Sequence, residues 1–76
     1  MDFREAAQLL GRQITTADMA KELDVSGHAV RQARLQEGAP GYRKAPEGWR
    51  TGFSRLALTR IEELQALISE LSSEAK

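Results

Sequence analysis

The chain has 76 residues, no cysteine, one histidine, and eleven basic against eleven acidic side chains, so its formal net charge is zero. This length fits one small domain, the lack of cysteine excludes disulfides and thiolate metal sites, and no apolar run approaches the roughly 20 residues of a membrane span. We therefore expect a cytoplasmic protein with no membrane partner.

The charges are unevenly distributed. Residues 1–27 hold three basic and five acidic side chains, residues 28–60 hold seven and two, and residues 61–76 hold one and four, which gives net charges of −2, +5 and −3. A basic central segment is typical of a nucleic-acid-binding surface, although chance clustering on a solvated surface produces the same pattern.

The first predicted element is a helix over residues 2–10. Asp2 and Glu5 have the spacing of a capping box, and Gly11 is a natural stop. The apolar residues at helical spacing, expected to face inward, are Phe3, Ala6, Ala7 and Leu10.

A second helix is predicted from about Thr15, since Thr15 and Asp18 again have capping-box spacing. Its buried residues are expected to be Ala17, Ala20 and Leu23. Asp24 tolerates left-handed backbone better than most residues, so we expect the chain to turn sharply there.

A third helix is predicted from Ser26, its N-cap, to about Leu35. Two short helices joined by a turn of about three residues form a helix-turn-helix arrangement, here over residues 15–35. On a helical wheel, the face opposite Val30 contains His28, Arg31, Gln32 and Leu35.

Residues 36–50 contain three of the six glycines and both prolines, which favours a loop or rudimentary wing. Arg43 and Lys44 make this loop basic and are expected to contact phosphate; a solvated connector is the alternative. Trp49 is expected to fold back as a core plug, because it is the largest apolar side chain in a chain with a small core.

Residues 51–76 form the predicted C-terminal segment, which closes the core and dimerises. Its long amphipathic helix is expected from about Thr51, or alternatively from Pro46, to about Ser73. Its heptad positions are Ala57, Ile61, Leu64, Ile68, Leu71 and Ala75. Isoleucine at a and leucine at d favour two strands in parallel pairs, although the pattern leaves open whether the helices pair parallel or antiparallel. We predict a homodimer interface at Ile61, Leu64, Ile68 and Leu71; the alternative is that this helix packs only within its own chain.

Catalysis is not expected. No nucleophile lies in a glycine-flanked elbow and no glycine-rich phosphate loop is present. Glu62 and Glu63 are adjacent on a helix and point apart, and His28 has no evident orienting partner. No cofactor, metal ion or small-molecule ligand is expected.

Residues 15–35, TTADMAKELDVSGHAVRQARL, resemble the helix-turn-helix of the phage repressor and Cro family and of related small bacterial regulators. Ala20 stands at the family's small helix-crossing position, Leu23 and Val25 at its core positions around the turn, and Val30 at that of the recognition helix. Asp24 departs from the usual glycine in the turn. The resemblance covers about 21 of the 76 residues.

This resemblance implies an all-α DNA-binding domain, formed by residues 1–50, in which one helix reads the major groove. The implied base-contacting residues are Ser26, Gly27, His28, Arg31 and Gln32. Arginine pairs with guanine and glutamine with adenine in this groove. The expected phosphate contacts are Thr15, Thr16, Arg34, Arg43 and Lys44. For Arg34, a surface ion pair with Glu37 is the alternative.

The sequence therefore predicts a dimeric regulator of transcription, with repression the expected mode, that binds an inverted repeat in double-stranded DNA. Half-sites would lie about one turn, roughly 34 Å, apart. The alternatives are a protein-binding adaptor or antiactivator, and a DNA-bending recombination factor resembling a phage excisionase.

Overall fold

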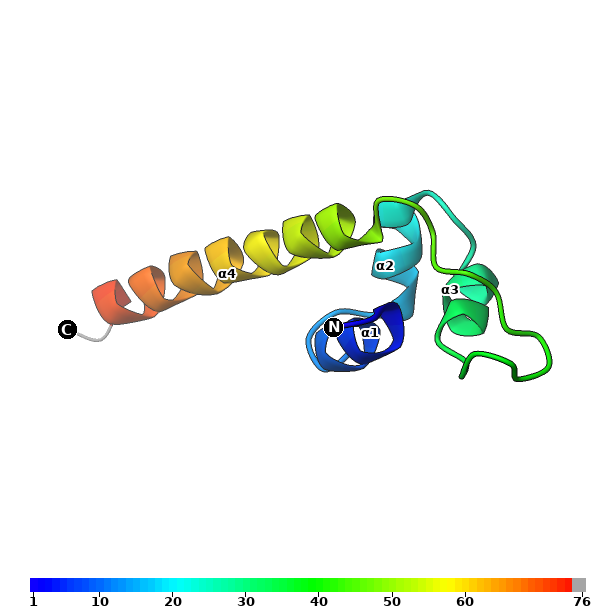
Figure 1. Ribbon diagram of the computed structural model, residues 1–76. Coiled ribbons are helices and arrows are strands. Elements are labelled where there is room, and N and C mark those ends of the chain that lie inside the picture. Colours follow the sequence, from blue (N-terminus) through cyan, green and yellow to red (C-terminus); the bar gives the residue numbers. More distant parts are fainter. Residues whose placement is uncertain (75–76) are drawn as a thin grey trace.

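The protein is described by a computed structural model covering residues 1–74, in which all regular secondary structure is helical (Figure 1). The four helices of this range are α1 (Phe3–Leu10), α2 (Thr16–Leu23), α3 (Gly27–Ala33) and α4 (Trp49–Glu74). The all-α prediction is confirmed. Helices α1 to α3 gather around the start of α4, whose remainder extends away from this head, giving overall dimensions of 56 × 20 × 19 Å (Figure 1).

The three short helices begin where the sequence predicts. At each start a side-chain oxygen accepts a hydrogen bond from the backbone N–H three residues later, at 2.8, 3.1 and 3.0 Å for Asp2, Thr15 and Ser26 respectively. Each of these bonds satisfies an amide that the helix leaves free and contributes about 1 kcal/mol. The local sequence therefore determines where the helices start.

The turn between α2 and α3 has the predicted length of three residues, Asp24 to Ser26. Asp24 has a φ of 56° and is left-handed, the only such non-glycine residue in the described chain. The N–H of Val25 donates to the Ala20 carbonyl at 3.0 Å and that of Asp24 to the Lys21 carbonyl at 3.3 Å, the pattern of a Schellman motif. The entry to α3 is thereby fixed by the end of α2.

Because Asp24 is left-handed and lies at the negative end of α2, Asp24→Gly is expected to stabilise the fold. Glycine relieves the strain of the left-handed backbone but loses more chain entropy on folding. The net gain in the free energy of unfolding should therefore be no more than about 1 kcal/mol. In thermal unfolding this corresponds to a rise in Tm of roughly 4–8 °C. Asp24→Val, which places a β-branched residue at the same backbone angles, should lower Tm, and a Tm unchanged in both variants would contradict this account of the turn.

The core lies between the head helices and the first turns of α4. Its buried residues are Phe3, Ala7, Ile14, Met19, Ala20, Val30, Ala33 and Phe53. The prediction for α2 was wrong in one residue: Ala17 is exposed, and the fully buried Met19 lies beside Ala20 instead. Helix α2 packs against both α3 and α4. Its buried face is therefore centred on Met19 and Ala20, and Ala17 lies outside it.

Trp49 is half-buried against the core, as predicted for a plug. Its ring centroid lies 5.3 Å from that of Phe3 and 5.5 Å from that of Phe53, both in edge-to-face orientation. Such pairs add about 0.5–1.5 kcal/mol to the burial of their area. This aromatic cluster joins the start of α1 to the start of α4.

Helix α4 begins at Trp49, between the two predicted starts at Pro46 and Thr51. Gly52 allows its close approach to α2, since a Cβ there would lie 2.6 Å from Cδ2 of Leu23. Residues 61–74 are all exposed, whereas Ala75, the last predicted heptad position, lies outside the described residues. None of the helices within residues 1–74 has both the length and the apolar composition needed to cross a membrane.

Helix α3 ends at Ala33, earlier than the predicted Leu35. The N–H of Leu35 donates to the Gln32 carbonyl at 3.2 Å, which tightens the last turn. The same carbonyl accepts the N–H of Arg43 at 3.3 Å, so the following loop is tied to the end of α3.

Candidate nucleic-acid interface

The predicted base-contacting residues lie at the start and on the outer face of α3. Ser26, His28 and Arg31 are exposed, and Gly27 is half-buried. The Arg31 guanidinium folds back over the helix start, since its Nη1 lies 3.5 Å from the position that a Cβ on Gly27 would take. The structure therefore brings Ser26, Gly27, His28 and Arg31 together on one small surface.

Gln32 differs from its neighbours. The residue is half-buried, and its side-chain Oε1 is buried without a hydrogen-bond partner in the described part of the chain. Bidentate recognition of adenine uses both ends of the carboxamide. Gln32 would have to rotate before this oxygen could reach a base, whereas Arg31 and His28 are already exposed.

Two hydroxyl groups, at the starts of α2 and α3, can each donate a hydrogen bond to a phosphate. Thr15 and Ser26 are exposed, and each hydroxyl oxygen accepts a backbone N–H as a helix cap. A hydroxyl that accepts such a bond still has its own hydrogen to donate. Thr16, the other predicted contact at the start of α2, is half-buried.

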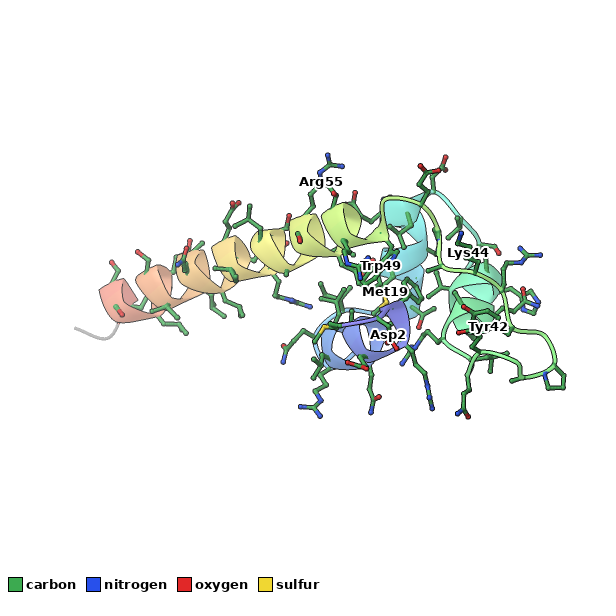
Figure 2. The ribbon with its side chains drawn as sticks, viewed as in Figure 1. Asp2, Met19, Tyr42, Lys44, Trp49 and Arg55 are labelled. Atoms are coloured by element: carbon green, nitrogen blue, oxygen red, sulfur yellow. The ribbon has the colours of Figure 1, made fainter. Side chains whose placement is uncertain are left out.

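The loop between α3 and α4 holds the other predicted cations next to α3. Arg43 and Lys44 are exposed, and the backbone bond from Arg43 to Gln32 keeps the loop against the helix. Ala45 anchors the far side of the loop by packing on the core. Figure 2 shows Tyr42 and Lys44 beside α3. The loop therefore adds its positive charge to the end of the molecule where α3 lies.

Arg34 is half-buried, and its guanidinium reaches the end of α1. Its Nη2 lies 3.9 Å from the position that a Cβ on Gly11 would take. A cation is favourable at this end of a helix, where carbonyl groups lack partners. The alternative ion pair between Arg34 and Glu37 does not form within residues 1–74.

The other three arginines of the basic segment lie on α4 and have intrachain partners. Arg50 stacks over Trp49 at 4.4 Å and donates to the Met1 carbonyl. The remaining contacts are Arg55 with Glu22 at 3.9 Å and Arg60 with Glu63 at 3.8 Å and with the Gln13 carbonyl. The basic charge near α3 thus reduces to Arg31, Arg34, Arg43 and Lys44.

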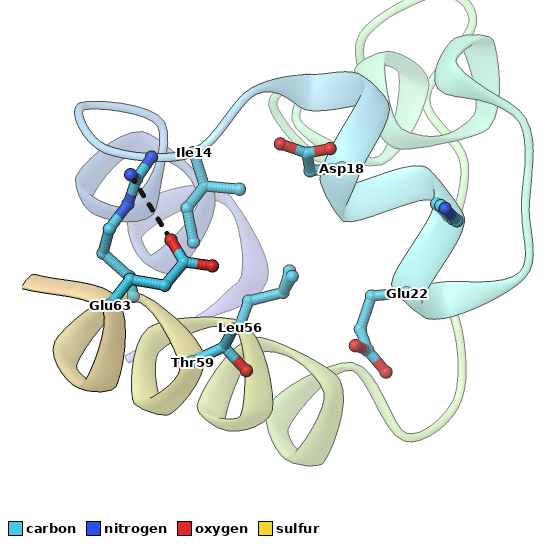
Figure 3. A pocket seen from close by; sticks show the side chains of 8 residues that line it. Ile14, Asp18, Glu22, Leu56, Thr59 and Glu63 are labelled. Atoms are coloured by element: carbon cyan, nitrogen blue, oxygen red, sulfur yellow. Dashed lines mark ion pairs between the residues drawn. The ribbon is translucent and has the colours of Figure 1, made fainter. Parts of the chain in front are cut away.

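A hollow between α2 and α4 has a different character (Figure 3). Its volume is about 450 Å³, and Ile14 and Leu56 form its apolar wall. Three carboxylates, of Asp18, Glu22 and Glu63, and two cations, of Lys21 and Arg60, complete its lining. The lining therefore has a small net negative charge and offers no net attraction to a phosphate backbone.

The predicted dimer residues form an uncovered apolar stripe on α4. Ile61, Leu64, Ile68 and Leu71 are each between 44 and 62% exposed. The alternative of packing within the chain applies only to the first part of α4, where Phe53 is buried and Leu56 and Ala57 are half-buried.

The sequence reasoning missed an apolar groove between α1 and the start of α4. This open groove has a volume of about 530 Å³, and Leu9, Leu10, Phe53 and Ala57 contribute to its walls. One available indication was that positions 50, 54 and 57 continue the heptad register of the stripe toward the amino-terminal end of α4.

Comparisons of the chain with protein-family models, with curated proteins and with solved structures gave no significant match.

Proposed function

We propose that this protein is a sequence-specific regulator of transcription that binds double-stranded DNA as a homodimer, with α3 of each protomer in the major groove of an inverted repeat. The observation that carries the proposal is the exposed surface of Ser26, Gly27, His28 and Arg31, held by the left-handed turn at Asp24 and flanked by basic side chains.

The dimensions of α3 support this role. Seven residues make a helix about 10 Å long, and the major groove is about 12 Å wide. Arg31 would donate two hydrogen bonds to O6 and N7 of a guanine, with His28 as a second base contact. Arg43, Lys44 and the hydroxyls of Thr15 and Ser26 would position the head by contacting phosphates.

The apolar stripe of α4 supports the homodimer. Four large aliphatic side chains in heptad positions are exposed on a helix that projects from its own core. Burying them against a second copy removes this area from water and joins two heads, so that both half-sites are bound at once. The four glutamates of residues 61–74 lie on the part of α4 that projects from the head, apart from the surface formed by α3 and the loop.

Arg31→Ala is expected to weaken binding to the selected sequence by roughly 5–150-fold, which corresponds to about 1–3 kcal/mol, and to relax preference at one base pair. Binding to random DNA should change much less. Titrations on both duplexes at one salt concentration measure this. The matched control is Arg55→Ala, which removes the same charge from α4, where Arg55 is exposed and paired with Glu22. Equal losses on both duplexes would contradict base contact by Arg31.

Arg43→Ala should instead weaken binding to all sequences alike. Its backbone bond to Gln32 is retained, so the loop stays in place. The loss of one phosphate contact should flatten the slope of log K against log salt by about 0.9. Titrations from about 50 to 200 mM salt measure the slope, and an unchanged slope would remove Arg43 from the phosphate contacts.

A protein-binding adaptor is the competing proposal, favoured by the exposed stripe and the four glutamates of residues 61–74. The same titrations separate the two, since an adaptor would bind no duplex more tightly than micromolar at moderate salt.

A further inference from the structure

The groove between α1 and α4 and the apolar stripe of α4 form one continuous surface. Ser54 and Ala57, which line the groove, occupy the a and d positions that precede Ile61 and Leu64 in the same heptad register. Leu9 is 48% exposed at one wall. The stripe therefore continues past Ile61 into the groove, where its heptad positions carry the small side chains of Ser54 and Ala57.

We propose that the groove holds the carboxyl-terminal end of α4 from a second copy of this chain, so that the two α4 helices pair antiparallel. In this register Ile61 packs against Leu64 of the other copy, Ala57 faces its Ile68, and Ser54 faces its Leu71. Each large side chain of the distal stripe thus meets a small residue of the groove. Both uncovered apolar surfaces are buried in one contact, whereas parallel pairing places each groove opposite the other and leaves it empty.

The charges favour the same direction. Residues 61–74 carry four glutamates and no basic residue, and the carboxyl-terminal end of a helix is itself negative. Parallel pairing would place two such ends side by side. In the antiparallel register the end at Glu74 approaches Arg50, which is exposed at the rim of the groove.

One consequence concerns DNA and therefore rests on the proposed function. The two-fold axis crosses α4 between residues 62 and 63, so the two helix starts at Trp49 lie about 40 Å apart at 1.5 Å per residue. Helix α3 lies farther out, beyond the start of α4 (Figure 1). The half-sites are then separated by about two turns, roughly 68 Å, and not by the one turn predicted from the sequence.

Disulfide trapping tests the direction, since the natural chain has no cysteine. Full-length Ala57→Cys and Ile68→Cys proteins are oxidised separately and as an equimolar mixture. In the proposed register equal positions lie about 16 Å apart along the axis, beyond the reach of a disulfide, while positions 57 and 68 face each other. We expect a crosslinked dimer only in the mixture.

A crosslink in either protein alone would show parallel pairing and overturn the proposal. A dimer that gives no crosslink in the mixture would overturn it as well, because the groove would then hold something else. If a cysteine variant fails to fold, spin labels at the exposed Ser73→Cys keep the test open. Ser73 lies on the face of α4 away from the stripe, so about 35 Å between the two labelled Cα positions is expected, against about 15 Å in a parallel pair. These measurements use no DNA, so trapping in the mixture without DNA binding would refute the proposed function alone.

Discussion

Phe53→Ala is expected to destabilise the fold by about 3–5 kcal/mol. Phe53 is 7% exposed and lies 5.2 Å from the ring of Phe3 and 5.5 Å from that of Trp49. Removing its ring leaves a cavity where α1, α4 and the core meet. A chain of 76 residues has roughly 4–11 kcal/mol of stability in total, so the variant should be largely unfolded at moderate urea concentrations that leave the parent folded.

Circular dichroism during urea unfolding measures this effect. The matched control is Leu58→Ala on the same helix, because Leu58 is 55% exposed and its loss should change the unfolding free energy by no more than about 0.5 kcal/mol. A similar decrease in the unfolding free energy of the two variants would mean that Phe53 is not a core residue and that the start of α4 does not pack against the other helices.

Ile68→Asp combined with Leu71→Asp is expected to give a monomer that still folds. Both side chains are exposed in the single chain, so the head retains its core, but a charge in the stripe opposes burial against a second copy. Loss of the second half-site contact should weaken operator binding by about 10²–10⁴-fold. Analytical ultracentrifugation and DNA titration measure the two effects.

The control is Ser69→Asp combined with Ser73→Asp, which adds the same two negative charges to the opposite face of α4. This variant should remain a dimer and lose little affinity. If analytical ultracentrifugation gave the Ile68→Asp and Leu71→Asp double variant the same mass as the unchanged protein, the role of the stripe in self-association would be contradicted.

The parts of the fold that depend on neighbouring residues could be predicted from the sequence. A capping bond joins residues three apart, so the starts at Asp2, Thr15 and Ser26 were visible in the spacing alone. The left-handed turn at Asp24 is equally local. The prediction that Ala17 is buried was wrong, because the burial of this residue depends on how α3 and α4 together cover α2.

The parts that depend on distant contacts could not be predicted. Gln32 seemed free to read a base, but burial places its Oε1 beneath other atoms, and the loop returns to its carbonyl from eleven residues away. Likewise, only the folded chain shows that Arg50 and Arg60 contact the carbonyls of Met1 and Gln13. These contacts reduce the basic segment to a smaller cluster around α3.

Selection of bound duplexes from a random pool by the purified protein, at one physiological salt concentration, tests the central claim most directly. The account predicts enrichment of one inverted repeat, bound with a Kd of about 10⁻⁸ to 10⁻¹¹ M and at least about 10³-fold more tightly than random DNA. A pool that acquires no common sequence, with binding no tighter than micromolar, would contradict it.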